Sequence, residues 1–338
     1  MLKKNIAING IGRIGKNIFR RYFEQDIKNC QLKVINIGSA NVDTKIHLLQ
    51  YDSVHGKAPM IIKRVSDSAI LVNGEYIELV KETEIGKIDW RKYNVDIVLE
   101  CTGRFTSKEK AVRHIEQGAR KVIVSAPCKD ADSTIIIGVN DNLLTIEDRI
   151  ISIGSCTTNC LAPVANILNT AFNIVSGFAT TVHSYTNDQN LVDSSHQDLR
   201  RARSAGMSII PTSTGAAEGI GLVLPELKGK LLGAAVRVPT QNVSMIDFVF
   251  NTKSRITVEK INSLFIKESQ GQSKHILSTV NIPLVSIDHN HTTSSVIFDL
   301  LETQIVQESN MGRILAWYDN EWAFCCRMLE LAQKVADL

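Results

Sequence analysis

The stretch Gly10-Ile11-Gly12-Arg13-Ile14-Gly15 follows the apolar run Ile6-Ala7-Ile8-Asn9 and precedes a segment with helical periodicity. This strand-to-helix setting is the one that the G-x-G-x-x-G fingerprint of dinucleotide-binding folds requires. In that fingerprint Gly10 permits the tight turn, Gly12 lets the backbone approach a pyrophosphate, and Gly15 lets the helix pack closely on the sheet. The sequence therefore predicts a nucleotide site directly after the first strand.

The first half of the chain alternates short apolar strands with amphipathic segments. Strands are expected at residues 5–9 and 32–37, and helices at 14–23 and 45–51. This β-α-β rhythm favours a parallel sheet flanked by helices. Asn73-Gly74 between two short apolar runs is typical of a type I′ hairpin turn. Further short buried strands are expected at residues 69–72, 76–80, 95–100, 121–125, 134–138 and 150–153.

The second half has a different texture. Strands become longer and more alternating, as at residues 234–238 and 243–251. Residues 184–211 form a polar, arginine-rich segment with few apolar periodicities, and a long segment of this kind is usually functional or buried at an interface. Residues 321–338 read as an amphipathic helix, whose apolar side holds Met328, Leu329, Leu331, Ala332 and Val335.

Bulk properties exclude several classes of protein. A chain of 338 residues is long for one core, so two domains are expected. The net charge of +3 implies no general attraction to nucleic acid or membranes. Seven cysteines without a Cys-x-x-Cys pair suggest neither a disulfide framework nor a zinc site, so no metal is expected. No apolar run approaches about 18 residues, and we expect a soluble, cytoplasmic protein.

The end of the second strand departs from the nucleotide fingerprint. An acid about 20 residues after the glycines normally accepts hydrogen bonds from the adenosine ribose. Here the strand ends Val34-Ile35-Asn36-Ile37-Gly38-Ser39, without a carboxylate. Ile37 provides neither an acceptor for the 2′-hydroxyl nor a charge that repels a 2′-phosphate. We therefore expect NAD as the cofactor, with weaker than usual rejection of NADP. Lys45 or Ser39 could help to bind NADP.

The run Ser155-Cys156-Thr157-Thr158-Asn159 places a thiol where a strand-like segment gives way to a helical one. Unpaired N–H groups and the positive end of the helix dipole favour a thiolate over a thiol at such a position. The same N–H groups, with three hydroxyls, could hold a phosphate or stabilise an oxyanion. The alternative is a small buried hydrophobic cysteine. Cys160, one turn later, is expected to serve packing, with an oxidation partner as the alternative.

With both motifs in this order, the chain resembles the glyceraldehyde-3-phosphate dehydrogenase family over nearly its whole length. The resemblance continues through His183-Ser184-Tyr185-Thr186, Asp198-Leu199-Arg200-Arg201-Ala202-Arg203, Pro211-Thr212-Ser213-Thr214-Gly215-Ala216-Ala217, Arg237-Val238-Pro239-Thr240 and Trp317-Tyr318-Asp319-Asn320-Glu321-Trp322.

The resemblance implies an α/β fold. Residues 1–155 and 320–338 would form a Rossmann-type doubly wound parallel sheet that binds the dinucleotide. Residues 156–319 would form an α+β catalytic domain with a mostly antiparallel sheet. The family is tetrameric, so a homotetramer is expected, with residues 184–211 between subunits.

The implied activity is the phosphorylating oxidation of glyceraldehyde 3-phosphate by NAD(P) and inorganic phosphate to 1,3-bisphosphoglycerate, a step of glycolysis and gluconeogenesis. Cys156 would form a thiohemiacetal and then a thioester, and His183 would be the base. Arginine suits phosphate recognition because its fork donates two parallel hydrogen bonds.

The resemblance also assigns binding residues. The substrate phosphate would contact Thr186, Asp188, Arg201 and Arg237, and the attacking phosphate Ser155, Thr157, Thr214 and Gly215, with Arg237 near both. Cofactor contacts would come from Gly10, Gly12, Arg13, Ile14, Gly15, Ile37, Ser125 and Asn320, the last holding the nicotinamide carboxamide.

Besides Ile37, three positions depart from the family pattern. Ile153-Gly154 stands where Asn-Ala is common, and Phe324 replaces a common tyrosine. Phe324 also occurs in the related erythrose-4-phosphate dehydrogenases, which are the first alternative, but the Tyr185-Thr186 pair favours the three-carbon substrate. The second alternative is a non-catalytic nucleotide- or RNA-binding module, to which the basic residues 200–203 give slight support.

Overall fold

The computed structural model describes residues 3–307 and 309–338, and the chain divides into two compact units. The first comprises Met1–Ile135, Asp141–Ser155 and Cys325–Leu338, and the second comprises Ile136–Asn140 and Cys156–Phe324. Compared with the bounds expected from the sequence, Ile136–Asn140 and residues 320–324 group with the second unit instead of the first.

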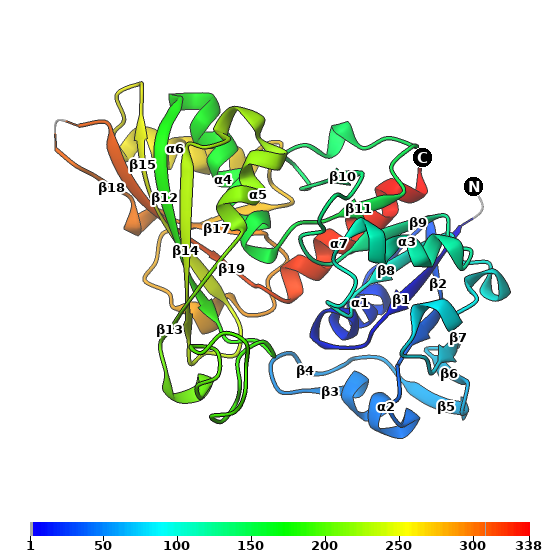
Figure 1. Cartoon of the computed structure of the whole chain (residues 1–338). Helices are drawn as coiled ribbons and strands as arrows, with labels where there is room; N and C mark the ends of the chain where they lie inside the picture. The colour runs from blue at the N-terminus through cyan, green and yellow to red at the C-terminus, as the bar shows by residue number, and fades with distance from the viewer. Residues whose placement is uncertain (1–2, 308) are drawn as a thin grey trace. The chain divides into compact units, whose positions relative to one another are not determined.

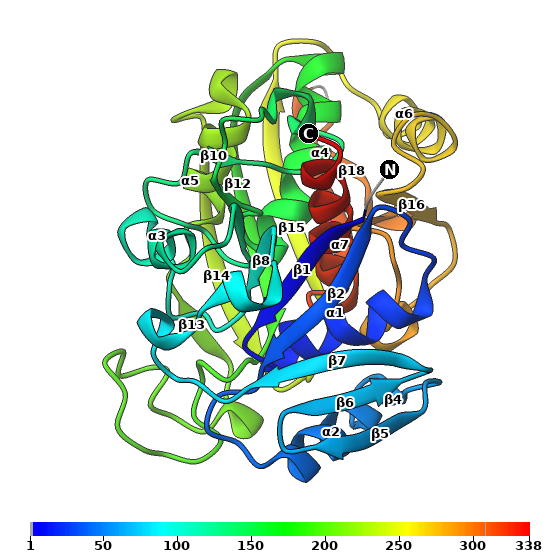
Figure 2. The ribbon, with the colours of Figure 1, turned by 90° about the vertical axis from the view of Figure 1, so that its right-hand side faces the viewer.

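A nine-stranded sheet forms the centre of the first unit as far as it is described, in the order β10-β11-β9-β8-β1-β2-β7-β6-β5. Figure 2 shows the part of this sheet from β8 through β1, β2, β7 and β6 to β5. Neighbours from β10 to β7 are parallel, and the β7-β6-β5 edge is antiparallel. The strands are β1 (Lys4–Asn9), β2 (Cys30–Asn36), β5 (Ile62–Ser66), β6 (Ala69–Val72), β7 (Glu75–Val80), β8 (Ile97–Glu100), β9 (Lys121–Val124), β10 (Ser133–Thr134) and β11 (Ile150–Ser152).

Strand order reverses at β1. The chain first adds β2 on one side of β1 and later adds β8 on the other side, so the crevice at the carboxyl ends of these strands is a topological switch point. Ligands of open α/β sheets bind at such points. The helices of this unit are α1 (Arg13–Glu24), α2 (Val42–Gln50), α3 (Lys108–Glu116) and most of α7 (Trp322–Ala336). The expected α/β class with a doubly wound sheet is confirmed.

The hairpin turn expected at Asn73-Gly74 is present. Asn73 and Gly74 both have positive φ, 48° and 94°, and Val72 pairs with Glu75 across the turn. This is the geometry of a type I′ turn. Shorter elements of the unit are β3 (Tyr51–Asp52), β4 (Gly56–Lys57), η1 (Ile85–Lys87), η2 (Trp90–Tyr93) and η3 (Asp141–Leu143).

The second unit contains a mostly antiparallel sheet in the order β13-β14-β12-β15-β19-β17-β16, with β18 beside β19. Its long strands β14, β12 and β15 run side by side in Figure 1. Only β12 with β14 and β16 with β17 are parallel pairs among the described strands. The strands are β12 (Ile174–Ser184), β13 (Ile210–Thr212), β14 (Leu231–Val238), β15 (Ser244–Thr252), β16 (Leu277–Val280), β17 (Val296–Asp299), β18 (Gln304–Ile305) and β19 (Met311–Tyr318).

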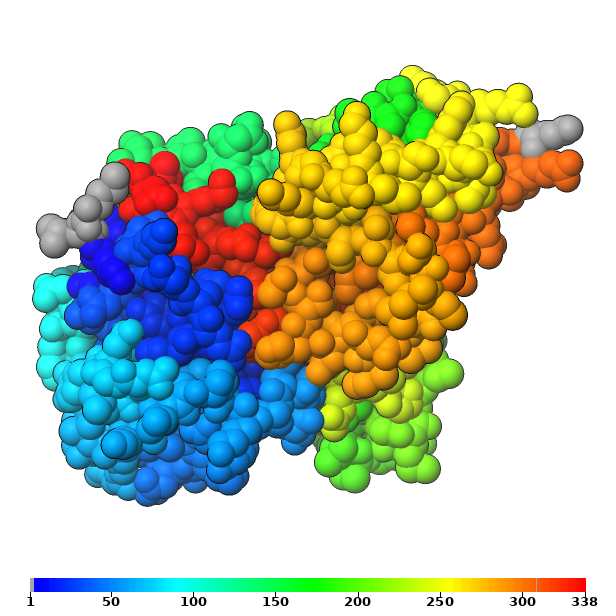
Figure 3. Space-filling view, turned by 180° about the vertical axis from the view of Figure 1, so that it is seen from behind, coloured from blue at the N-terminus to red at the C-terminus, as the bar shows by residue number. Residues whose placement is uncertain are grey.

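Three helices accompany this sheet: α4 (Cys156–Phe172), α5 (Ala216–Val223) and α6 (Val258–Gln270). The helix α6 lies exposed on one face of the second unit (Figure 3), while its Ile261 and Phe265 are buried. Phe265 stacks on Phe298 of β17 with ring centroids 3.8 Å apart, so α6 is anchored by its apolar stripe. Short 3-10 turns are η4 (Ala205–Met207), η5 (Pro225–Leu227), η6 (Ser286–His289) and η7 (Leu300–Glu302).

Two local expectations were wrong in their bounds. The strand expected at 134–138 is limited to Ser133–Thr134, because the chain leaves the first sheet there and Ile136–Asn140 group with the second unit. The helix expected at 45–51 begins earlier, at Val42, because the Asn41 side chain caps it by accepting from the N–H groups of Asp43 and Thr44.

Candidate active site

Cys156 is the first residue of α4, and its sulfur lies 3.4 Å from Nε2 of His183. His183 is the penultimate residue of β12 and is 4% exposed. A thiol and an imidazole at this distance form the contact that a nucleophile and its base require. The two residues that the sequence selected as the catalytic pair are therefore adjacent in the second unit.

The other ring nitrogen of His183 meets two polar groups. Nδ1 lies 2.7 Å from the carbonyl oxygen of Ser184 and 2.8 Å from Nη1 of Arg237. Burial, and then the nearby Arg237 charge, lower the pKa of His183 to about 3. The imidazole is therefore neutral at physiological pH, which leaves it able to accept a proton.

The thiol of Cys156 differs from the sequence expectation. Burial raises its pKa above the ordinary value, although the Arg237 charge and hydrogen bonds from Thr157 act in the opposite direction. The helix start alone predicted a favoured thiolate, and that prediction was wrong because burial outweighs the N–H groups. Cys156 and His183 thus form a neutral pair.

Tyr318 is a part of the site to which the sequence gave no role. Its hydroxyl lies 2.9 Å from the Thr157 hydroxyl and 2.8 Å from the Thr181 hydroxyl, and its ring packs edge-on against His183. Burial raises its pKa, so the hydroxyl stays protonated. Tyr318 ends β19 with a buried side chain, and the alternation of that strand was the available signal.

Asn320 is held in one orientation. Its Oδ1 accepts hydrogen bonds from the hydroxyls of Ser184, at 2.9 Å, and Ser244, at 2.8 Å. Because both hydroxyls donate to the oxygen, the amide nitrogen is fixed on the other side of the carboxamide. Asn320 is 5% exposed and belongs to the second unit.

The residues expected to bind the substrate phosphate have different hydrogen-bond and ion-pair partners, although burial, and then the nearby Arg237 charge, lower the pKa of Arg201. Arg201 forms ion pairs with Asp188 and Asp198. Thr186 contacts Gln189, whose side-chain oxygen accepts from the Thr186 N–H at 2.9 Å. Arg237 instead contacts His183. The guanidinium of Arg201 is therefore held by carboxylates, which a bound phosphate would have to displace.

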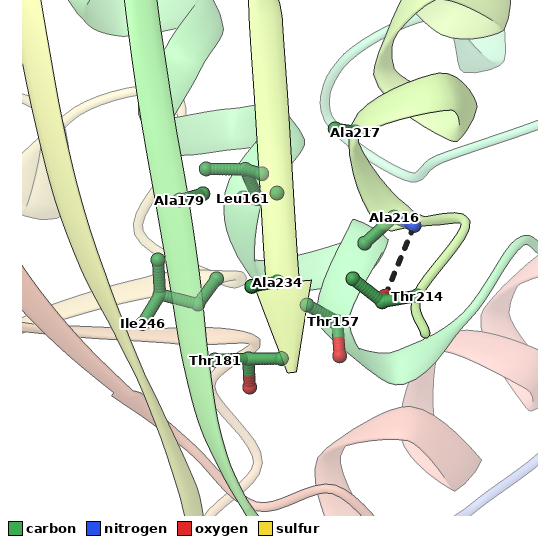
Figure 4. A pocket seen from close by; sticks show the side chains of 10 residues that line it. Thr157, Leu161, Ala179, Thr181, Thr214, Ala216, Ala217, Ala234 and Ile246 are labelled. Carbon is green, nitrogen blue, oxygen red and sulfur yellow. Dashed lines mark hydrogen bonds between the residues drawn. The ribbon is translucent and has the colours of Figure 1, made fainter. Parts of the chain in front are cut away.

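Two of the four residues expected to bind the attacking phosphate line a small cavity of about 10 Å³ (Figure 4). Thr157 and Thr214 line it together with Thr181 and small apolar side chains. The Thr214 hydroxyl accepts from the N–H of Ala216, and Gly215 is the N-cap of α5. A volume of this size holds about one water molecule. Ser155, the fourth expected residue, belongs to the first unit.

The glycine fingerprint borders a cavity of about 280 Å³ in the first unit. Gly10 has φ 95°, and a Cβ on Gly15 would lie 1.9 Å from the Gly10 carbonyl oxygen. Around Gly12 no atom lies within 4 Å of such a Cβ. The turn, the close packing and the open approach expected of Gly10, Gly15 and Gly12 are all present in the geometry.

Residues that follow β1, β2 and β8 line this cavity. Ile37 is among them, and Lys45 and Arg104, which bring positive charge, also line it. The sequence named Lys45 but missed Arg104, because only the fold brings the end of β8 beside the glycines. The full lining is Asn9, Gly10, Ile11, Gly12, Asn36, Ile37, Gly38, Lys45, Glu82, Thr83, Ile85, Ile88, Cys101, Thr102, Arg104 and Phe105.

Four expected cofactor residues of this unit do not line the cavity: Gly15, which packs against the Gly10 carbonyl, and Arg13, Ile14 and Ser125. Arg13 forms an ion pair with the buried carboxylate of Asp52, to which Lys16 also pairs. The carbonyl of Ile14 accepts a hydrogen bond from the Cys325 thiol, and the N–H of Ser125 donates to the Glu100 carbonyl. Burial raises the pKa of Asp52, but hydrogen bonds from Arg13 and Lys16 outweigh this and hold it below its usual range.

A buried hydrogen-bond chain supports the cavity wall. Trp90 donates to Nδ1 of His114 at 3.0 Å, so Nε2 of His114 carries the proton and donates to Glu100 at 2.9 Å. Glu100 also accepts from Asn9 at 2.6 Å, and Asn9 accepts from Asn36 at 2.7 Å. The ends of β1, β2 and β8 are thereby fixed relative to one another.

All seven cysteines are free thiols. Within residues 3–307 and 309–338, no group of three or more His, Cys, Asp or Glu side chains is arranged to hold a metal ion. No helix in the same ranges is long and apolar enough to cross a membrane.

The first unit has a glycine fingerprint at the switch point of a parallel sheet, and the second has a cysteine in contact with a histidine. This combination is typical of nucleotide-dependent dehydrogenases with a thiol nucleophile. The chain belongs to the glyceraldehyde-3-phosphate dehydrogenase family. Residues 4–108 match the model of that family's NAD binding domain, and residues 155–320 match the model of its C-terminal domain. The chain is therefore an oxidoreductase with a nicotinamide-binding domain.

Curated relatives cover nearly the whole chain. A plasmid-encoded glyceraldehyde-3-phosphate dehydrogenase of Cupriavidus necator is 48% identical over 98% of both chains. Glyceraldehyde-3-phosphate dehydrogenase 2 of Bacillus subtilis is 45% identical over 99% of this chain and 97% of its own length. The enzyme of Priestia megaterium is 48% identical over 98% of both chains.

Proposed function

We propose that the chain is a phosphorylating glyceraldehyde-3-phosphate dehydrogenase of glycolysis and gluconeogenesis. It would oxidise glyceraldehyde 3-phosphate, with a nicotinamide cofactor and inorganic phosphate, to 1,3-bisphosphoglycerate. The observation that carries this proposal is the 3.4 Å contact between Cys156 and His183, with Arg237 against the same imidazole. The names of the relatives support this substrate over erythrose 4-phosphate.

In this mechanism the sulfur of Cys156 attacks the aldehyde carbon, and the thiol proton passes to the carbonyl oxygen to give a thiohemiacetal. His183 then removes the hydroxyl proton through Nε2 while the carbon loses a hydride. The nicotinamide cofactor, when bound, supplies the hydride acceptor. An oxygen of inorganic phosphate attacks the resulting thioester, and the sulfur leaves as the acyl phosphate forms. The neutral state of His183 suits this role because a protonated ring could not act as the base.

Two anion sites follow from the reaction. Arg237, with Thr186, Asp188 and Arg201, would hold the substrate phosphate. Ser155, Thr157, Thr214 and Gly215 would hold the attacking phosphate. Support comes from the contact of Arg237 with His183 and from the position of Thr157 and Thr214 beside one small cavity. Asp188 must release Arg201 before that arginine can bind an anion.

The cofactor proposal is NAD with weaker than usual rejection of NADP. Gly10, Gly12 and Ile37 line the cavity in which the adenosine half would bind, with Arg13, Ile14, Gly15 and Ser125 close in sequence to the strand ends. Lys45 and Arg104 offer positive charge to a 2′-phosphate, and Glu82 offers the only carboxylate among the lining residues. The free amide nitrogen of Asn320 would donate to the nicotinamide carboxamide.

A cytoplasmic homotetramer is the proposed assembly. The segment 184–211 carries exposed large apolar side chains, among them Leu199 at 82% and Met207 at 89% exposure. Such side chains are costly to leave in water and suit a subunit interface. Sedimentation of the purified chain tests this, and a monomer at micromolar concentration would contradict it.

The decisive experiment is a steady-state assay of glyceraldehyde 3-phosphate and erythrose 4-phosphate with NAD and NADP, each with and without inorganic phosphate. We expect phosphate-dependent reduction of the cofactor and a higher kcat/KM for the three-carbon aldehyde. A preference for the four-carbon aldehyde would assign the other substrate. Salt-dependent RNA binding without any dehydrogenase activity would instead identify a binding module.

A further inference from the structure

Three polar atoms meet beside the imidazole of His183. Nδ1 lies 2.7 Å from the Ser184 carbonyl oxygen and 2.8 Å from Nη1 of Arg237, and that Nη1 lies 3.0 Å from the same oxygen. Each separation is within the range of a hydrogen bond. The three atoms therefore form a closed triangle.

The three contacts cannot all be hydrogen bonds in one protonation state. A guanidinium nitrogen only donates, and a carbonyl oxygen only accepts. If Nδ1 carries the proton, it donates to Ser184 but faces an N–H of Arg237. If Nδ1 is bare, it accepts from Arg237, whose second N–H serves Ser184. The position of Arg237 therefore decides between the two neutral tautomers of His183.

The tautomer of His183 also determines whether the opposite ring nitrogen, Nε2, presents a proton or a lone pair to the Cys156 sulfur. A neutral imidazole has one proton, so a bare Nδ1 means that Nε2 carries it and donates towards Cys156. A protonated Nδ1 means that Nε2 is bare and can accept a proton. Burial and Arg237 hold the pKa of His183 at about 3, so the doubly protonated ring is not the resting form.

Arg237 is itself incompletely satisfied. Its Nε is buried and has no hydrogen-bond partner in the part of the chain that the structure describes. Burial lowers the pKa of this guanidinium, which means that its charge lacks full compensation. An anion that offers two oxygens would satisfy such a group better than one imidazole nitrogen and one carbonyl.

We propose that Arg237 is a positioning residue that sets the tautomer of His183. Without an anion, Arg237 donates to Nδ1 and holds the ring in the Nε2–H form. A phosphate group that draws the guanidinium away lets Nδ1 take up a proton and donate to Ser184, while the Nε2 proton passes to solvent. The charge of the ring does not change.

This inference rests on the proposed roles of Cys156 and His183, and it gives Arg237 a role beyond phosphate binding. Before an anion arrives, the ring donates to the sulfur and is not available as a base. Once phosphate occupies Arg237, Nε2 becomes a base directly beside the sulfur. Base catalysis is thereby coupled to the presence of the anion that the reaction needs.

The test is nitrogen NMR of the full chain, free of cofactor and labelled with ¹⁵N-histidine. The His183 signals are identified by their loss in His183→Asn, and the ¹⁵N shifts report which ring nitrogen carries the proton. We expect a protonated Nε2 without anion and a protonated Nδ1 at saturating inorganic phosphate, with chloride at equal ionic strength as the blank. A protonated Nδ1 without phosphate, or no change at saturation, would overturn the inference.

Variants separate this role from general stability. Arg237→Met keeps the length of the side chain but removes the donors, so Nδ1 should be protonated with or without phosphate. Arg201→Met is the matched control, because Arg201 contacts Asp188 and Asp198 and not His183. It should retain the Nε2–H form without phosphate. Arg237→Lys should restore the Nε2–H form in part, since an ammonium can also donate to Nδ1. An unchanged tautomer in Arg237→Met would refute the role.

The tautomer proposal and the proposed dehydrogenase function can fail independently of each other. A wild-type protein that reduces cofactor with phosphate but shows no tautomer change retains the function and loses the inference. A protein that changes tautomer but oxidises no aldehyde loses the function and retains the inference. The phosphate titration of the wild type suffices if Arg237→Met does not fold.

Discussion

The sulfur of Cys156 lies 3.4 Å from Nε2 of His183, and burial acts on the two groups in opposite directions. It raises the pKa of the thiol and lowers that of the imidazole to about 3. Both shifts favour the uncharged form, so the pair rests as thiol and imidazole. Arg237, which contacts the imidazole at 2.8 Å, is a group of this site that can respond to a bound anion.

Replacement of the nucleophile should abolish turnover. In Cys156→Ser the hydroxyl is a far weaker nucleophile than a thiol, so phosphate-dependent cofactor reduction should fall by roughly 10³-fold or more. Cofactor affinity, measured by titration, should stay within about twofold, since the dinucleotide cavity is built from other residues. Cys160→Ala is the matched control, because Cys160 is fully buried and should affect stability more than catalysis. Wild-type activity in Cys156→Ser would contradict the mechanism.

The low pKa of His183 predicts how stability depends on pH. The unfolded chain takes up a proton near the ordinary pKa of 6.5, whereas the folded protein does so only near 3. Between these values the unfolded state binds more protons, so His183 reduces the free energy of unfolding progressively as the pH falls from 6.5 towards 3. His183→Gln does not titrate there.

Urea unfolding of both proteins at about pH 7.5 and about pH 5 measures this contribution. Acidification should lower the stability of the wild type more than that of His183→Gln. Equal losses in the two proteins would show that His183 is not held neutral by the fold.

Cofactor selectivity should respond to residue 37. Ile37→Asp restores a carboxylate beside the cavity, which can accept from a ribose 2′-hydroxyl and repels a 2′-phosphate. The ratio of the NADP to the NAD dissociation constant should rise by at least about tenfold, or ~1.4 kcal/mol. Ile37→Leu is the apolar control and should leave the ratio unchanged. If the wild type already rejects NADP strongly, Glu82 becomes the residue to test as a substitute acid.

Substitutions at two glycines of the fingerprint should affect stability and cofactor binding separately. In Gly15→Ala the new methyl group would lie 1.9 Å from the Gly10 carbonyl oxygen, so the free energy of unfolding should fall by more than ~2 kcal/mol. Gly12 has extended backbone and open space around it. Gly12→Ala should therefore keep stability within about 1 kcal/mol while cofactor affinity falls. Equal stability losses in both variants would argue against these separate roles.

Local chemistry made part of the fold predictable. The Asn73-Gly74 turn formed because its two positive φ angles depend only on its own residues. The strand expected at 134–138 was wrong because its end depends on distant packing: a Cβ on Gly138 would lie 2.4 Å from the Ile276 side chain. Three consecutive isoleucines look like a buried strand whichever unit buries them.

The candidate site likewise has features that local sequence predicts and features that depend on the fold. Cys156 and His183 are identified by motif and are adjacent, but the resting state of the thiol depends on burial, which no local pattern records. The ion pairs of Arg201 with Asp188 and Asp198 likewise depend on the course of the segment 184–211. Arg104 lines the nucleotide cavity because the strand order places the end of β8 beside β1, and no local pattern around Arg104 indicates this.

The first unit is discontinuous in the sequence, since Cys325–Leu338 belong to it together with Met1–Ile135 and Asp141–Ser155. Within that unit the Cys325 thiol donates to the carbonyl of Ile14, and the Cys30 thiol donates to that of Ala332. During synthesis Cys325 and Ala332 emerge from the ribosome only after the whole second unit. The unit whose strands are made first is thus completed only after the second unit, and the nascent chain carries an unfinished nucleotide-binding core until α7 is translated.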